Sequence, residues 1–140
     1  MGCTHCLQPF RQNRKLTTMN LNADNIQAVY SSLDPIFLNS PQFELDALNT
    51  ALGARLILKV ESLNPIRSFK GRGTDCFVKA HPKKAPFVCA SAGNFGQGMA
   101  YACQEQTIPL TVFSATTANP LKLERMRELG AEVVFSRRGF

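Results

Sequence analysis

The residues of this sequence that are best suited to chemistry lie in two short segments. The first reads Ser68-Phe69-Lys70-Gly71-Arg72-Gly73, and its lysine lies where a helix is expected to begin. A free lysine amine is a charged, non-nucleophilic ammonium at neutral pH. Burial and the positive end of a helix dipole both favour the neutral amine, which can form an imine with an aldehyde. Lys70 is therefore a candidate nucleophile. The alternative is a lysine whose stem packs while its ammonium reaches solvent.

The second segment lies between an expected strand and an expected helix and reads Ser91-Ala92-Gly93-Asn94-Phe95-Gly96-Gln97-Gly98. Backbone N–H groups at such a helix start can bind an anion, such as a phosphate or an amino-acid carboxylate. The glycines follow G-x-x-G-x-G rather than G-x-G-x-x-G, so a dinucleotide fold is not indicated. No Gly-Lys-Ser/Thr of a Walker loop follows either. Close packing of a helix on a sheet also selects small residues, and it remains the alternative.

The elements that must position these segments alternate along the chain. We expect helices over 22–32, 69–80, 93–106 and 120–129, helical turns within 43–52, a buried strand over 55–60, and strands over 86–90, 109–114 and 132–136. Ser68 is the expected N-cap of the helix over 69–80. Strands separated by helices of this length predict right-handed βαβ units and a parallel sheet.

The helix over 120–129 has the clearest boundary signals. Asn119 can cap it, Pro120 suits its first position, and Gly130 ends it. Its expected apolar positions are Leu121, Leu123, Met126 and Leu129.

Composition excludes several classes of protein. The chain has 140 residues, of which 44% are hydrophobic and 19% charged, as in an ordinary globular protein. No apolar run is long enough to span a membrane, and the N-terminus has no secretory pattern, so we expect a cytoplasmic protein. The net charge is +6, but the basic residues are dispersed and no aromatic residues interleave with them, so nucleic acid is not an expected partner.

Five cysteines are present. Cys76, Cys89 and Cys103 lie in apolar or helical patterns and are expected to be buried, reduced thiols. Cys3 and Cys6 form a CxxC around His5, but no second ligand pair follows, so we expect no metal site and interpret residues 1–20 as a disordered leader.

Taken together, the two segments resemble a known family. Four parts of the sequence are similar in order and spacing to the serine/threonine dehydratase family. They are residues 58–65, 68–73, 91–98 and 121–134, the last with Lys122 and the ending Leu129-Gly130-Ala131-Glu132-Val133-Val134. Its members are pyridoxal-phosphate enzymes of the tryptophan-synthase-β-like fold, also called fold type II. The resemblance covers residues 35–140.

The resemblance implies a role for each candidate residue. Lys70 would be the Schiff-base lysine, and Phe69 would pack close to the pyridoxal 5'-phosphate. Asn94 would hydrogen-bond the ring hydroxyl of the cofactor. Ser91, Gly93 and Asn94 would bind the carboxylate of a small amino-acid substrate. The implied reaction is ammonia-lyase chemistry, in which a hydroxy-amino acid such as threonine or serine yields a 2-oxo acid and ammonia.

The resemblance also implies a two-domain α/β protein with parallel sheets flanked by helices. Residues 21–84 would form the N-terminal part of the large domain, and residues 85–140 would begin the small domain. The family's later phosphate-binding loop and its partner for the pyridine nitrogen are absent after Gly98, so we interpret the chain as the N-terminal part of a longer protein. The full-length protein could be a homo-oligomer.

Two positions depart from the family pattern. Phe95 stands where the family often has His, so one polar contact to the substrate carboxylate is missing. Ala92 stands where the family's racemases commonly have Ser, and without that hydroxyl elimination is favoured over racemisation. A β-replacement enzyme of the same fold and a catalytically inactive fragment remain alternatives.

Overall fold

The computed structural model describes residues 22–81 and 85–136. In chain order its elements are α1 Ala23–Tyr30, a 3-10 turn Pro35–Phe37, β1 Gln42–Glu44, α2 Asp46–Leu52, β2 Ile57–Lys59, α3 Lys70–Lys79, β3 Phe87–Ala90, α4 Asn94–Glu105, β4 Leu110–Ala115, α5 Pro120–Glu128 and β5 Glu132–Ser136. The fold is therefore α/β, as the alternating pattern predicted.

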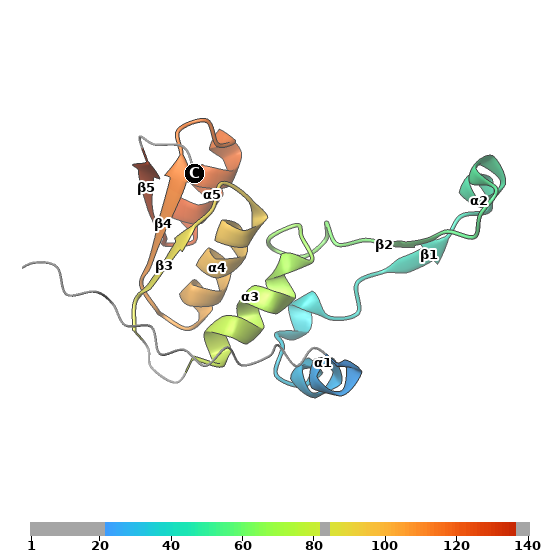
Figure 1. The fold of residues 1–140 in the computed structure, drawn as a ribbon, viewed down its shortest axis with the longest axis horizontal. Coiled ribbons are helices and arrows are strands. Elements are labelled where there is room, and N and C mark those ends of the chain that lie inside the picture. The colour runs from blue at the N-terminus through green and yellow to red at the C-terminus, as the bar shows by residue number, and fades with distance from the viewer. Residues whose placement is uncertain (1–21, 82–84, 137–140) are drawn as a thin grey trace, which may run out of the picture.

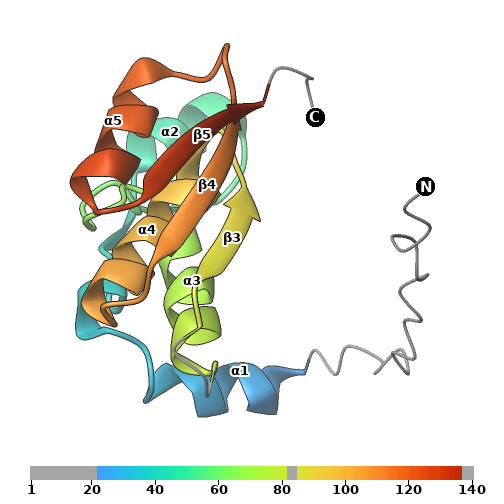
Figure 2. The same ribbon diagram turned by 90° about the vertical axis from the view of Figure 1, so that its left-hand side faces the viewer.

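The body of the molecule is a parallel sheet in the order β3-β4-β5 with helices on one face. α4 and α5 cover that face, and α3 packs on the far side of α4 (Figures 1 and 2). Alternate residues of β4 point into this layer, and Val112 and Ser114 are fully buried. The core between sheet and helices is built from Val78, Met99, Ala100, Ala102, Cys103, Ile108, Leu110, Val112, Met126, Leu129 and Ala131.

The boundaries of α5 confirm the local signals. The Asn119 Oδ1 accepts a hydrogen bond from the Leu121 N–H at 2.9 Å, and Pro120 occupies the first turn. Gly130 follows the helix with a φ of +82°, a conformation that glycine adopts without steric cost. Leu123 and Met126 are buried as expected, but Leu121 is 74% exposed. The burial expected for Leu121 was therefore wrong.

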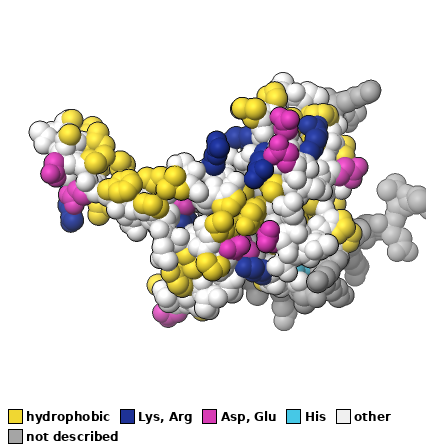
Figure 3. All heavy atoms as spheres, turned by 180° about the vertical axis from the view of Figure 1, so that it is seen from behind, with side chains coloured by type: hydrophobic (Ala, Val, Ile, Leu, Met, Phe, Trp, Pro, Cys, Tyr) yellow, Lys and Arg dark blue, Asp and Glu magenta, His cyan; other side chains and the backbone are white. Residues whose placement is uncertain are grey.

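A second unit, the arm, projects from the body (Figure 1). It consists of β1, α2 and β2, in which Gln42 to Glu44 pair antiparallel with Lys59 to Ile57. The helical turns expected within 43–52 are confirmed as α2, with β1 just before it. The burial expected for the strand over 55–60 was wrong, because that strand is largely exposed. Its exposure is decided by the tertiary structure, since β2 pairs, among the described residues, only with the three-residue β1. Hydrophobic side chains lie along the arm in Figure 3. The exposed hydrophobic residues of this part of the chain include Phe43, Leu45, Leu52 and Ile57.

The three cysteines of the described residues are free thiols. Cys103 is buried as expected, whereas Cys76 and Cys89 are only half-buried. Burial raises the pKa of the Cys103 thiol to about 11. The leader with its CxxC lies outside the described residues. Within 22–81 and 85–136, no cluster of metal-binding side chains occurs, and no helix is long and apolar enough to cross a membrane.

Candidate functional site

The loop that leads to Lys70 is held together by one side chain. The Asn64 Oδ1 accepts hydrogen bonds from the N–H groups of Ile66 and Ser68, both at 3.2 Å. The Asn64 Nδ2 donates to the carbonyl oxygens of Glu61 at 2.8 Å and Ser68 at 3.1 Å. The Asn64 amide therefore hydrogen-bonds through both its nitrogen and its oxygen to the backbone of residues 61–68. These bonds close the loop that leads the chain into α3.

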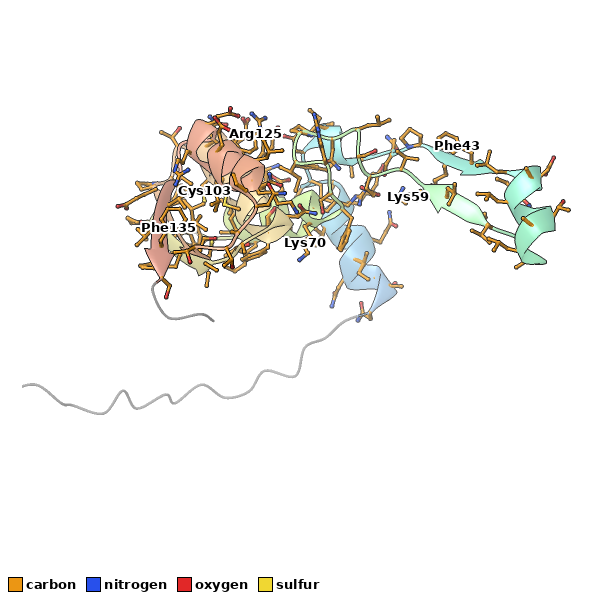
Figure 4. The ribbon with its side chains drawn as sticks, turned by 90° about the horizontal axis from the view of Figure 1, so that it is seen from above. Phe43, Lys59, Lys70, Cys103, Arg125 and Phe135 are labelled. Carbon is orange, nitrogen blue, oxygen red and sulfur yellow. The ribbon has the colours of Figure 1, made fainter. Side chains whose placement is uncertain are left out.

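α3 begins at the candidate lysine. Phe69, not Ser68, is the residue immediately before α3, and its dihedral angles are already helical. Ser68 still serves the helix start, since its hydroxyl accepts a hydrogen bond from the Lys70 N–H at 3.3 Å. Lys70 is exposed, and Phe69 is 63% exposed. In Figure 4 Lys70 lies at the start of α3, between the sheet and the arm.

The first turn of α3 is anchored to the base of the arm. The Arg72 guanidinium donates at 2.8 Å both to the Glu61 carboxylate and to the Ser40 hydroxyl. Ser40 in turn donates to the same Glu61 oxygen at 2.9 Å. Burial would raise the pKa of Glu61, but the hydrogen bonds from Arg72 and Ser40 outweigh it, so the pKa lies below its ordinary value. This cluster ties Lys70, two residues away, to the rest of the chain.

The second segment forms a tight turn before α4. The Ser91 hydroxyl accepts hydrogen bonds from the N–H groups of Gly93 at 3.2 Å and Gly96 at 2.8 Å. Asn94, the first residue of α4, accepts at Oδ1 a hydrogen bond from the Lys122 ammonium of α5 at 2.8 Å. A helix start that carries an amide and a nearby ammonium can bind an anionic group.

Close packing of α3 on α4 brings the two segments to one end of the molecule. A Cβ at Gly98 would lie 2.6 Å from the Thr74 Oγ1, so only glycine permits this approach. Thr74 lies one helical turn after Lys70, and Gly98 lies one turn after Asn94. The helices run side by side in the same direction (Figures 1 and 2), so Lys70 and Asn94 start at the same end of the pair.

A cavity of about 770 Å³ opens beside this end. It lies between the loop over 65–67 and α5, and Asn94 and Lys122 both line it. Further lining residues are Gln97, Asn119, Leu121, Glu124, Arg125 and Glu128.

The structure therefore places the lysine and the amide that the sequence singled out at the same end of the α3–α4 pair, although Lys70 does not line the cavity. Ser91, Gly93 and Asn94 are half-buried in one turn, whereas Ala92 and Phe95 are exposed. Sequence reasoning missed the contact of Lys122 with Asn94 and the central position of Asn64. Pro120 after Asn119 signalled the helix start that positions Lys122, but nothing local indicated which side chain it would reach.

Comparison with known proteins identifies relatives of this chain. The profile of the family described as "Pyridoxal-phosphate dependent enzyme" matches residues 33–140. The human protein named L-serine dehydratase/L-threonine deaminase is 37% identical over 102 residues, which cover 71% of this chain and 31% of that protein.

Solved structures have the same fold. The processed form of threonine deaminase isoform 2 from Solanum lycopersicum superposes with a TM-score of 0.68 at 26% identity, over 85% of this chain and 35% of that one. Maize serine racemase superposes with a TM-score of 0.73 at 22% identity, over 84% of this chain and 36% of that one. The chain thus spans about a third of the length of these relatives.

Proposed function

Because this chain belongs to the family of pyridoxal-phosphate-dependent enzymes, we propose that the full-length protein is an ammonia-lyase that converts serine, threonine or a similar hydroxy-amino acid into a 2-oxo acid and ammonia. The observation that carries this proposal is that Lys70 and Asn94 begin α3 and α4, at the same end of this helix pair. The relative named L-serine dehydratase/L-threonine deaminase supports the dehydratase reaction over other reactions of the family.

The residues present fit the cofactor. Lys70 offers an exposed primary amine, which is the group that reacts with an aldehyde. Among the described residues, the backbone N–H groups of Asn94 and Phe95 donate to no protein acceptor, so the start of α4 retains donors for an anion. Phe69, next to Lys70, is 63% exposed, and its ring can pack on an aromatic ligand.

When bound, pyridoxal phosphate supplies an electron sink that stabilises negative charge at the substrate Cα. In the proposed mechanism Lys70 would hold the cofactor, and its amine would take the proton from the substrate Cα as general base. The turn of Ser91, Gly93 and Asn94 binds the substrate carboxylate and so directs the Cα–H bond towards Lys70. Ala92 has no hydroxyl to return a proton on the opposite face, which favours loss of the β-hydroxyl over racemisation.

The proposal includes the surroundings of the site. Residues 21–84 would belong to the large domain and residues 85–140 to the small domain, with the cofactor between them. Sequence beyond Phe140 would supply the phosphate-binding loop and the partner of the pyridine nitrogen. The free thiols among the described residues support a reducing compartment, which we propose is the cytoplasm.

Borohydride reduction of the full-length protein loaded with pyridoxal phosphate tests the proposed lysine. Peptide mapping should find the reduced cofactor on Lys70, and Lys70→Ala should lose the visible absorption band of the bound cofactor. Lys59 and Lys79 are the controls, because Lys59 ends β2, Lys79 ends α3 and both carry the same amine. A label on either of them, with Lys70 unlabelled, would refute the assignment.

The reaction is tested with L-serine and L-threonine. The unmodified protein should release ammonia and 2-oxo acid from these far faster than it forms the D-enantiomers. Ala92→Ser should increase the share of racemisation, because it restores a hydroxyl on the face opposite Lys70. Predominant racemisation by the unmodified protein would contradict the proposal, and β-replacement without ammonia release would favour a synthase.

A further inference from the structure

We infer that Lys122 is a positioning residue for the cofactor: it fixes the side-chain amide of Asn94 so that both amide N–H bonds remain available to the bound group. This inference rests on the proposed function. It assigns a task to a residue of α5 that lies 28 positions from Asn94 in the sequence.

The orientation of the amide follows from the chemistry of the ammonium. The Lys122 Nζ lies 2.8 Å from the Asn94 Oδ1. An ammonium has three donors and no acceptor, whereas an amide has an acceptor oxygen at one end and a donor nitrogen at the other. The end of Asn94 that faces Lys122 must therefore be the oxygen, and the Nδ2 is turned away from Lys122.

The ammonium is held over the turn by its own helix. The Asn119 cap and Pro120 fix the start of α5, so Lys122 lies in the first turn of that helix. A Cβ at Gly93 would lie 3.8 Å from the Lys122 Nζ, which shows how close the ammonium is to the turn. Lys122 is half-buried, and no carboxylate of the described residues forms an ion pair with it.

The amide nitrogen remains free for a ligand. Among the described residues, the Asn94 Nδ2 donates to no protein acceptor, and Asn94 lines the cavity beside α5. Without Lys122 the amide could rotate by half a turn at little cost, because its two ends are similar in shape. The rotated amide would then present an oxygen to an oxygen of the ligand, which is repulsive.

The test compares single and double variants of the full-length protein with pyridoxal phosphate as the probe. Lys122→Met keeps most of the length of the stem but removes the donors, and we expect the Kd for the cofactor to rise about tenfold, the value of one hydrogen bond. The midpoint pH of the change in the visible band should move towards that of Asn94→Ala. Lys122→Arg, which keeps a cationic donor, should stay within about threefold of the unmodified protein.

Two comparisons separate positioning from other roles. If Lys122 acts through Asn94, Lys122→Met in the Asn94→Ala background should change neither the Kd nor the midpoint pH further. If Lys122→Met raises the Kd equally with Asn94 present and in the Asn94→Ala background, the inference is overturned and Lys122 binds the anionic cofactor directly. Arg125→Met is the control for general charge, because Arg125 lies one turn on in α5 and pairs with Glu128 at 2.9 Å. An equal loss in Arg125→Met would also overturn the inference.

Failure of the proposed function has a different signature. In that case the unmodified protein would bind no cofactor at Lys70, and Lys122→Met would leave any remaining cofactor binding unchanged. Circular dichroism of each variant without cofactor monitors folding, and Lys122→Arg provides a folded variant if Lys122→Met is unstable. A Lys122→Met protein that is folded and binds the cofactor as the unmodified protein does would refute the inference.

Discussion

The contact between α3 and α4 predicts opposite effects for two glycine substitutions. Gly98 in α4 and Gly73 in α3 are both helical and both have negative φ, so alanine is conformationally acceptable at each. A Cβ at Gly98 would lie 2.6 Å from the Thr74 Oγ1 and 3.2 Å from the Ile66 Cδ1. A Cβ at Gly73 would meet nothing within 4 Å.

The size of each effect follows from helix propensity and packing. Alanine is favoured over glycine inside a helix by about 1 kcal/mol, so Gly73→Ala should stabilise the protein by roughly that amount. At Gly98 the same gain is opposed by overpacking, which costs about 1–3 kcal/mol. Thr74 cannot move aside cheaply, because it is 3% exposed and its hydroxyl donates to the Lys70 and Gly71 carbonyl oxygens, both at 3.1 Å. The overpacking cost therefore lies at about 2–3 kcal/mol, and after the helix-propensity gain of about 1 kcal/mol we expect Gly98→Ala to destabilise the protein by about 1–2 kcal/mol.

Urea unfolding of the full-length protein, followed by circular dichroism, measures both substitutions. Gly98→Ala should lower the unfolding midpoint and Gly73→Ala should raise it. Gly98→Ala should also weaken cofactor binding, because Lys70 and Asn94 lie one turn from the contact. Adding Thr74→Ala to Gly98→Ala should recover part of the loss, since it removes the clashing hydroxyl. Equal and stabilising shifts at both glycines would show that the helices are not in close contact, and our account of the site would be wrong.

Three further predictions concern groups around the site. Asn64→Asp keeps the acceptor of the loop but loses two donated hydrogen bonds, so the free energy of unfolding measured in urea should fall by about 2 kcal/mol. Borohydride labelling of Lys70 by the cofactor should also decrease, and an unchanged stability and labelling would contradict the role of Asn64. The pKa of Glu61 is lowered in the folded protein, so the stability that Glu61 contributes is present above pH 4.5 and is lost as the pH falls through its pKa in the folded state. Glu61→Gln should flatten the acid dependence of the free energy of unfolding, and an unchanged pH dependence would exclude the Glu61–Arg72 pair as its source. Burial and the Asp34 carboxylate raise the pKa of Tyr101 to about 12, so the free energy of unfolding should fall as the pH rises from 10 towards 12, and the absorbance of the Tyr101 tyrosinate should appear only near pH 12. A Tyr101→Phe protein that loses the same stability over this pH range would refute this prediction.

Much of the fold could be predicted from local signals. The strands over 86–90, 109–114 and 132–136 and the helices between them are found within a residue or two of the expected positions, because caps, glycine ends and apolar runs act over a few residues. The strand pairing of the arm was not predictable in this way. β1 exists only through pairing with β2, and the exposure of the strand near 55–60 depends on what packs against it. An apolar run shows that a segment is hydrophobic, but not which neighbour covers it.

The sequence by itself determined the kinds of group at the site and the elements that carry them: an amine at the start of α3 and a small-residue turn with an amide at the start of α4. Only the tertiary structure decided how these groups meet. Gly98 lets α3 approach α4, Asn64 shapes the loop before Lys70, and Lys122 reaches Asn94 from α5. The physical reason is range, since caps and periodicity depend on neighbours within one or two helical turns, whereas these contacts depend on which helix faces pack together.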